Sequence, residues 1–248
     1  MEQNNQFNDD YPGQHGTPIG GIICSNNEAS LHPLKNFDET GYGTLFDILC
    51  SLSYVESLPQ TCLINASFGC FSKVIHPFLE QKINALNGKA LLIVAAGNRP
   101  SATAAPINYS TSALKFFPAC YEAPNVISVT SLKLIRKGTP QFLKPLLWAG
   151  LLKKTYIAPH ENYSKDYIDI GVLTQKGFYP NPFDSTLPEH EGSSYATAFV
   201  TQLAAKLFAS TGIIPSKSDL LNSIEEENQS GFEFNSFPIK NGRILKNI

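Results

Sequence analysis

The sequence GSSYATAFV at residues 192–200 places two serines directly before an apolar run of small residues that continues to Phe208. A serine becomes a nucleophile when a base takes its proton and its Oγ stands clear of the backbone, which the start of a helix provides. The N-terminus of a helix also directs unpaired N–H groups and a positive dipole end toward any negative charge that forms there. Ser194 is placed for that role. The alternative is that Ser193 and Ser194 cap the helix, which is the commoner use of such serines and the one that this stretch alone favours.

Two other stretches supply what a nucleophilic serine needs. The sequence QHGTPIGGII at residues 14–23 places His15 at the start of an apolar helix. The sequence AAGN at residues 95–98 places the amide side chain of Asn98 at the end of a strongly apolar strand. A histidine can take the proton of the serine, and an amide N–H can donate to a developing oxyanion. Together the three stretches favour nucleophilic catalysis over capping.

With these residues in view, the chain resembles the subtilisin-like serine protease family, peptidase S8. The patterns of that family around histidine, oxyanion asparagine and serine are HGTHVAG, AAGN and GTSMATP, and all three have counterparts here in the same order. The resemblance extends from about Asp9 to the C-terminus. It implies a serine endopeptidase in which Ser194 is the nucleophile, His15 the base, and Asn98 an oxyanion donor together with the Ser194 N–H.

The chain also departs from the family patterns. Ser193, Tyr195 and Ala198 stand where the family has threonine, methionine and proline, and Pro18 replaces the second histidine of HGTH. These changes are compatible with the retained serine and histidine.

The aspartate of the catalytic triad is the larger difference. In the family it ends the first core strand, usually as D-[ST]-G, some thirty residues or more before the histidine. Here only fourteen residues precede His15, and they contain no such motif. Asp9 and Asp10 are close in sequence, but a few loop residues do not place a carboxylate on the far ring nitrogen, so we interpret them as solvated loop acids. We therefore expect the N-terminal segment with the catalytic aspartate to be missing.

Length and composition are those of one globular domain. The 248 residues are 42% hydrophobic and 16% charged, which is enough for a sizeable core. The expected elements alternate between strands and helices, which is typical of an α/β fold. They are helices at 15–24, 44–55, 77–86 and 216–227, and strands at 61–66, 90–96 and 125–132. The resemblance implies a single subtilisin-like domain over residues 1–248, with three layers, a mostly parallel central sheet and helices on both faces.

Charge and targeting signals restrict the partners. The net charge of −2 gives no reason to expect a nucleic acid. The polar residues 1–8 do not resemble a signal peptide, and no apolar run has the length of a membrane span, so we expect no membrane partner. The resemblance implies a peptide or protein substrate, and the oligomeric state stays open.

The cysteines indicate the compartment. Their number is odd and they lack CxxC spacing, which argues against both a disulfide framework and a zinc site. They are Cys24, Cys50, Cys62, Cys70 and Cys120. We expect buried free thiols and a cytoplasmic location, with secretion as the alternative if the N-terminus is truncated. We also expect no cofactor. The resemblance to the family leaves calcium open, but no acidic cluster here matches a calcium site of that family.

The family also implies a substrate groove. Ser67, Phe68 and Gly69 follow a predicted strand and correspond to the family sequence S-L-G, which lines one side of that groove. A peptide substrate adds to this segment as an extra strand through main-chain hydrogen bonds. Gly97, directly before Asn98, is expected to contact substrate as well.

Residues 133–160 are longer and more apolar than the family requires, and they can be interpreted as an insertion within the domain. A packed hairpin, a partner-binding surface and a lid are all compatible with them, and the hairpin is the simplest. For the whole chain, the alternative to an active protease is a truncated or inactive subtilisin-like domain that serves as a binding scaffold.

Overall fold

The structure is a computed structural model, and it describes most of the chain. The described residues are 9, 14–25, 29–136, 155–174, 176–183, 186, 189–224 and 238–246. None of the helices in these ranges is long and apolar enough to cross a membrane.

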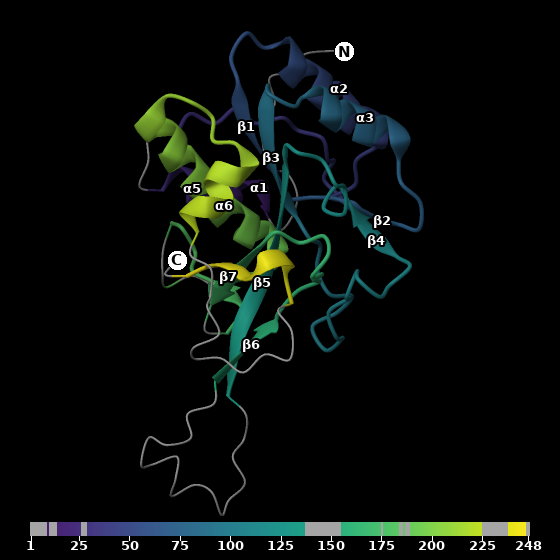
Figure 1. Cartoon of the computed structure of the whole chain (residues 1–248), viewed down its shortest axis with the longest axis vertical. Coiled ribbons are helices and arrows are strands. Elements are labelled where there is room, and N and C mark those ends of the chain that lie inside the picture. Colours follow the sequence, from purple (N-terminus) through teal and green to yellow (C-terminus); the bar gives the residue numbers. More distant parts are fainter. Residues whose placement is uncertain are drawn as a thin grey trace, which may run out of the picture.

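A six-stranded sheet runs through the molecule (Figure 1). Its strands are, in spatial order, β1 (Cys62–Ala66), β3 (Ala90–Ala95), β5 (Val126–Arg136), β7 (Ile170–Thr174) and β10 (Arg243–Leu245), with β6 (Thr155–Pro159) also paired to β5. Neighbours along the main order are parallel, whereas β6 runs antiparallel to β5. The predicted mostly parallel sheet is confirmed.

Helices and two small sheets complete the described part of the chain. The helices are α1 (Gly16–Cys24), α2 (Leu45–Ser57), α3 (Pro77–Ala85), α5 (Ser193–Thr211), α6 (Lys217–Ser223) and the short 3-10 helix η2 (Lys240–Gly242). The small sheets are antiparallel and pair β2 (Cys70–Ser72) with β4 (Lys115–Phe117), and β8 (Phe178–Tyr179) with β9 (His190–Glu191). Of the expected helix at 216–227, residues 225–227 lie outside the described residues.

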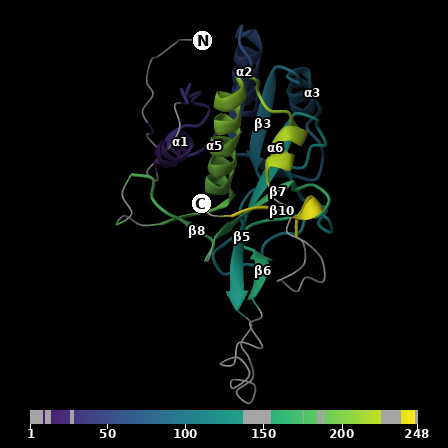
Figure 2. The ribbon, with the colours of Figure 1, turned by 60° about the vertical axis from the view of Figure 1, so that its left-hand side comes forward.

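Helices cover both faces of the sheet. Strand β3 is buried along its whole length, and its side chains alternate between two hydrophobic clusters. Leu92 and Val94 join the cluster that includes α2 and α3, whereas Leu91 and Ile93 join the one that includes α1, α5 and α6. Successive side chains of a strand point to opposite faces, so the molecule has three layers. Figure 2 shows α1 and α5 on one side of β3 and α3 on the other.

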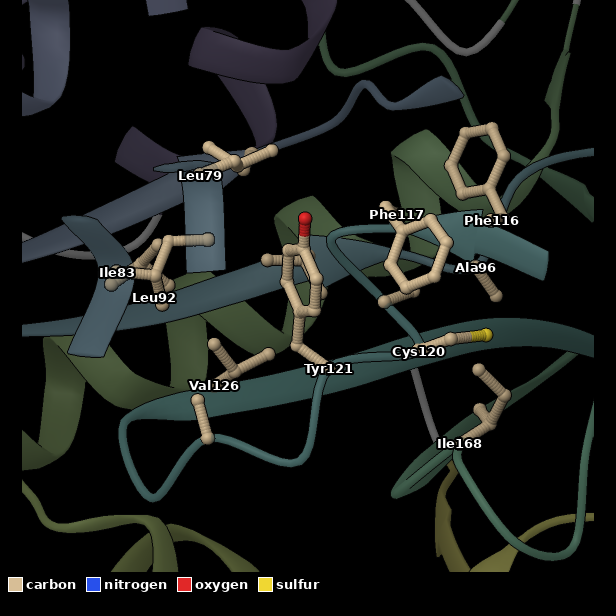
Figure 3. Packing of buried hydrophobic residues seen from close by; sticks show 14 of the residues in the cluster. Leu79, Ile83, Leu92, Ala96, Phe116, Phe117, Cys120, Tyr121, Val126 and Ile168 are labelled. Atoms are coloured by element: carbon tan, nitrogen blue, oxygen red, sulfur yellow. The ribbon is translucent and has the colours of Figure 1, made fainter. Parts of the chain in front are cut away.

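The cluster on the α2–α3 face is built from aliphatic and aromatic side chains of several elements. Figure 3 shows Tyr121 surrounded by Leu79 and Ile83 of α3, Leu92 of β3 and Val126 of β5. Burying an aliphatic side chain of this size stabilises the fold by roughly 1.5–3 kcal/mol. These contacts hold α3 against strands β3 and β5, and Asn98 follows the carboxyl end of β3.

Helix α5 lies close to the sheet because its inner residues are small. Ala196, Ala198 and Ala204 are fully buried, and α5 contacts α1 as well as β1, β3 and β5 of the sheet. Ser67 follows β1 and Asn98 follows β3, and the carboxyl ends of parallel strands meet at one edge of a sheet. The α5 N-terminus lies at this edge, where open α/β sheets bind ligands.

The ends of the predicted insertion form an antiparallel ladder. Arg136 of β5 pairs with Thr155 of β6, and the ladder continues to Leu132 opposite Pro159. A hairpin begins in this way, while residues 137–154 lie outside the described residues.

All five cysteines are free, as predicted, but only Cys120 is fully buried. The expectation of buried thiols was therefore wrong for the other four, which lie in half-buried or exposed segments.

Candidate active site

Ser193 and Ser194 occupy the first turn of α5 and do not cap it. The N-cap is Gly192, with φ of 117°, and no side chain makes a capping hydrogen bond there. Ser194 is 8% exposed, and its Oγ donates to the carbonyl oxygen of Ser67 at 3.2 Å. Ser67 Oγ donates in return to the carbonyl oxygen of Ser194 at 2.9 Å. The capping alternative is thus excluded, and Ser194 lies beside the predicted groove segment.

Asn98 is fixed against the start of α5 by its side-chain oxygen. Asn98 Oδ1 accepts from the Ser193 N–H at 2.8 Å and from Ser193 Oγ at 3.0 Å. Because Oδ1 is occupied, the Nδ2 hydrogens are the part of the amide that can donate to an incoming group. A Cβ on Gly192 would lie 3.0 Å from Asn98 Nδ2, so the glycine also leaves room for this amide. The arrangement creates a donor site next to a positive helix end.

His15 stands at the N-cap position of α1 and packs against α5. Its ring contacts the Tyr195 ring edge-on, with centroids 5.7 Å apart, and Tyr195 stacks on His190 at 4.5 Å. Burial lowers the pKa of His15, the charge of Asp9 opposes this shift, and nearby His190 adds to it. The imidazole is therefore neutral at neutral pH, as a general base must be.

Asp9 lies near His15 but bonds to another residue. Its Oδ2 accepts from the Thr17 N–H at 2.7 Å and from Thr17 Oγ1 at 2.9 Å. The carboxylate thus binds the first turn of α1 and is not simply a solvated loop acid, while Asp10 lies outside the described residues. The N–H groups of a first helical turn lack intrahelical partners, which is the reason for this contact.

Ser194 and His15, the predicted nucleophile and base, are not hydrogen-bonded to each other. Within the described part of the chain, no hydrogen bond joins the His15 ring to Ser194 Oγ or to a carboxylate. The serine hydroxyl points to Ser67 instead. Catalysis by this pair requires Ser194 to rotate about its side-chain bond, and such catalytic contacts are often long or absent before substrate binds.

The four predicted groove residues have different surroundings. Gly69 and Gly97 both pack against Phe116. An added Cβ would lie 2.4 Å from its ring at Gly69 and 2.9 Å from it at Gly97. Gly97 also has φ of +78°, a conformation that favours glycine. Phe68 is half-buried and packs against the core, with its ring 5.3 Å from that of Phe37. Of the four, Ser67 alone has a hydrogen bond with Ser194 among the described contacts.

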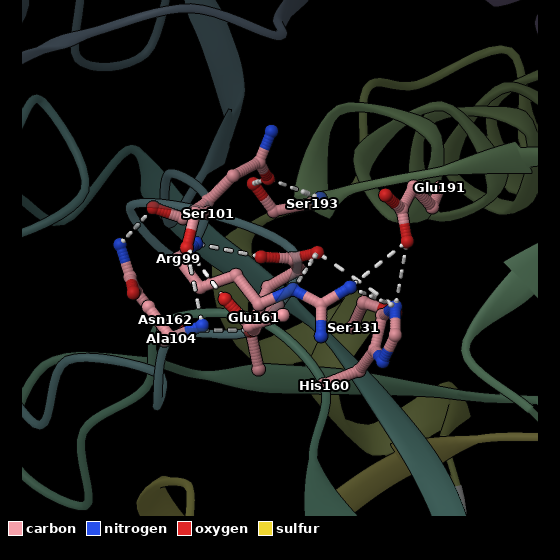
Figure 4. A network of polar contacts seen from close by, with 12 residues as sticks. Arg99, Ser101, Ala104, Ser131, His160, Glu161, Asn162, Glu191 and Ser193 are labelled. Carbon is pink, nitrogen blue, oxygen red and sulfur yellow. Dashed lines mark hydrogen bonds and ion pairs between the residues drawn. The ribbon is translucent and has the colours of Figure 1, made fainter.

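A polar network beside Asn98 was missed by the sequence analysis. Arg99 Nη2 lies 3.0 Å from Glu191 Oε2 and 3.5 Å from His160 Nε2, and the Arg99 N–H donates to Glu161 Oε2 at 2.7 Å (Figure 4). Burial raises the pKa of Glu161, whereas burial and the Arg99 charge lower that of His160. The available signal was a charged residue directly after the oxyanion asparagine.

This network has the residue types of a metal site, but it does not fit calcium. Ligand atoms of His160, Glu161 and Glu191 lie within 4.8 Å of one another. Calcium prefers six to eight oxygen ligands, and here one of three candidates is an imidazole. The Arg99 guanidinium already provides a positive charge beside both carboxylates.

Asn162 is a second residue that the sequence analysis assigned no role. Its Nδ2 donates to the carbonyl oxygen of Asn98 at 2.7 Å and to Tyr109 Oη at 2.9 Å. Tyr109 Oη donates in turn to the carbonyl oxygen of Ala96 at 2.6 Å. Hydrogen bonds from the buried Asn162 amide and the buried Tyr109 phenol therefore hold the backbone carbonyls on both sides of Gly97.

Comparison with known proteins agrees with this geometry. The family model of the subtilase family, Peptidase_S8, matches residues 2–219. Comparison with curated protein sequences gives no match.

Solved structures resemble the fold at low sequence identity. The subtilase cytotoxin SubAB assembly matches with a TM-score of 0.62 and 18% identity, over 93% of this chain and 73% of that one. The A-subunit of the AB5 toxin from E. coli matches with a TM-score of 0.61 and 17% identity, over 93% and 75%. A cold-adapted subtilisin-like serine proteinase matches with a TM-score of 0.61 and 16% identity, over 94% and 74%.

Proposed function

Because the chain belongs to the subtilase family of serine proteases, we propose that it is an endopeptidase that hydrolyses peptide bonds in proteins. In this proposal Ser194 is the nucleophile, His15 the general base, and Asn98 Nδ2 and the Ser194 N–H are the oxyanion donors. The observation that carries it is the pairing of Asn98 Oδ1 with Ser193, which fixes a donor beside the nucleophile.

The reaction follows from these positions. Ser194 Oγ releases the Ser67 carbonyl, passes its proton to His15 and bonds to the carbon of the scissile carbonyl. The carbonyl oxygen becomes an oxyanion and accepts hydrogen bonds from Asn98 Nδ2 and the Ser194 N–H. His15 then gives its proton to the leaving nitrogen, the C–N bond breaks, and a water molecule removes the acyl group from Ser194. Substrate would lie along Ser67–Gly69 and Gly97.

Covalent labelling tests this proposal directly. We expect a fluorophosphonate probe to form an adduct on Ser194, detected by mass spectrometry of the intact protein and of its peptides. Ser194→Ala should remove the adduct, and Ser210→Ala, at an exposed position of the same helix, should retain it. Folded protein that takes no label and cleaves no peptide in a library would overturn the proposal.

A binding scaffold is the second candidate function. It is favoured by the absence, among the described contacts, of a hydrogen bond between His15 and either Ser194 or a carboxylate. Losing the aspartate of a serine protease triad reduces the rate by roughly 10⁴. A scaffold would bind peptides along Ser67–Gly69, measured by fluorescence anisotropy, without cleaving them. Wild-type protein that takes no label, together with peptide binding that survives Ser194→Ala, would support this second function.

A further inference from the structure

The network around Arg99 connects three segments that meet at the candidate site. Arg99 directly follows Asn98, Glu161 follows β6, and Glu191 ends β9 only three residues before Ser194. The guanidinium of Arg99 contacts both carboxylates, at 3.8 Å for Glu161 Oε1 and 3.0 Å for Glu191 Oε2. The ion pairs of Arg99 therefore link the segment after Asn98 to the segments that carry Glu161 and Glu191.

Glu161 is the buried anchor of this network. Its side chain is 2% exposed, whereas that of Glu191 is 41% exposed. A buried carboxylate remains ionised only when charged or N–H donors compensate for its lost hydration. Arg99 provides both kinds, through its guanidinium and through its backbone N–H at 2.7 Å from Glu161 Oε2. Removing Glu161 would leave the guanidinium with His160 and with the exposed Glu191 as its remaining carboxylate among the described contacts.

The backbone contact is the one that matters for the oxyanion site. The N–H that Glu161 accepts belongs to the peptide group between Asn98 and Arg99, and the carbonyl oxygen of that same group accepts from Asn162 Nδ2 at 2.7 Å. One peptide plane is thus held at both its polar atoms by side chains of neighbouring residues. A fixed plane at this point sets the position of the Asn98 Cα and Cβ, from which the hydrogen bond of Oδ1 to Ser193 directs the amide.

We propose that Glu161 is a positioning residue, which acts through Arg99 to hold the Asn98 amide where an oxyanion would form. This inference rests on the proposed function for its effect on catalysis, but its structural part concerns only the order of the Asn98 side chain. Donors aimed in advance at the developing charge are effective because they need no reorganisation during the reaction.

The first test is kinetic. Glu161→Leu removes the acceptor of the Arg99 N–H, and we expect kcat for a peptide substrate to fall by about tenfold with KM nearly unchanged, because the donor is needed most in the transition state. Glu161→Gln keeps an acceptor and should restore most of the rate. In an Asn98→Ala background the same substitutions should change kcat by less than about twofold, since residues that act as a unit are not additive.

Glu56→Gln is the matched control, because it breaks an exposed ion pair with Lys82 far from Asn98 in the sequence. It should leave kcat unchanged in both backgrounds. Equal losses from Glu161→Leu in the wild-type and Asn98→Ala backgrounds would overturn the inference. If Glu161→Leu does not fold, Glu161→Gln decides alone. A small loss of kcat that disappears in the Asn98→Ala background supports the inference. A loss of kcat that persists in that background overturns it.

A second measurement does not require activity. Nuclear magnetic resonance relaxation of the Asn98 side-chain NH₂ group reports its order directly, and we expect Glu161→Leu to lower the order parameter. Glu161→Gln, which keeps an acceptor, and Glu56→Gln should leave it nearly unchanged. An unchanged order parameter in Glu161→Leu would overturn the inference even in an active protease. Folded protein that takes no fluorophosphonate and cleaves no peptide overturns the proposed function instead, and the relaxation result still decides the role of Glu161.

Discussion

The two halves of the candidate site are held in different ways. The oxyanion half consists of Asn98 and the start of α5, and hydrogen bonds from Ser193 and Asn162 fix the amide and its backbone. The base half is His15, which packs against the Tyr195 ring and whose own ring has no hydrogen bond to a carboxylate among the described residues. Hydrogen bonds define direction, whereas ring packing defines position more than rotation. The structure therefore has a preorganised donor and a less constrained base.

The largest effect is expected on the oxyanion half. In subtilisin, loss of the corresponding donor lowers kcat by roughly 10²–10³, and we expect Asn98→Ala to lower the labelling rate and kcat here by a similar factor. The measurement is the rate of fluorophosphonate labelling together with peptide hydrolysis. Asn87→Ala, at an exposed turn after α3, is the control that should have no effect. A loss below about threefold would mean that the amide is not a transition-state donor.

The next test concerns the glycine that makes room for this amide. Gly192→Ala places a Cβ 3.0 Å from Asn98 Nδ2 at a residue with φ of 117°, so we expect slower labelling by roughly tenfold or more. Gly212→Ala is the matched control, because its φ is +70° and its added Cβ would meet nothing within 4 Å.

Both glycine variants should lose about 1–2 kcal/mol of unfolding free energy from backbone strain, measured by urea denaturation. Only Gly192→Ala should also slow labelling. Slowing by both variants to the same extent would show that global stability, and not the Asn98 position, controls the site.

The sequence predicted the placement of Asn98 beside the Ser194 helix better than it predicted the surroundings of His15. The motifs around Ser194 and Asn98 are local, and each follows a strand or opens a helix, so the parallel sheet brings them to one edge. The apolar run of β3 likewise predicted a strand buried on both faces. Its alternation between two clusters follows from the twofold period of a strand.

What the sequence could not predict depends on contacts between distant segments. Glu161 accepts from the Arg99 N–H, 62 residues earlier in the chain. Asp9 accepts from Thr17 and has no hydrogen bond with the His15 ring among the described contacts. No local pattern marks either pairing, because each depends on how two loops meet at the sheet edge. The direction of the Ser194 hydroxyl is a rotamer choice, which is also set by its three-dimensional surroundings.

The base half can be tested through Tyr195. Tyr195→Leu removes the ring that packs on His15, so the imidazole becomes better hydrated. Burial is the main cause of the lowered pKa of His15, and its loss should raise that pKa toward the ordinary value. Since the base works only when neutral, the acid limb of the pH–rate profile should move to higher pH, toward the ordinary histidine pKa of about 6.5, with a rate loss of less than about twofold at neutral pH.

The control for Tyr195→Leu is Tyr54→Leu, which removes a similar contact with the exposed His32, where the ring centroids are 5.5 Å apart. It should leave the pH–rate profile unchanged. An acid limb that stays in place in Tyr195→Leu would show that the base is oriented by something other than this ring.

The smallest effect is expected from Asp9, and its sign is opposite to that of Tyr195→Leu. The charge of Asp9 raises the pKa of His15 against the effect of burial, so Asp9→Asn should lower this pKa further and move the acid limb to lower pH. An asparagine still accepts from Thr17, and unfolding free energy should fall by less than about 1 kcal/mol. Asp38→Asn is the matched control, because Asp38 Oδ1 accepts from the N–H and Oγ1 of Thr40 in the same manner at a different place. If Asp9→Asn instead abolished activity while Asp38→Asn did not, Asp9 would be the orienting carboxylate of the base, and the two halves of the site would be equally constrained once substrate is bound.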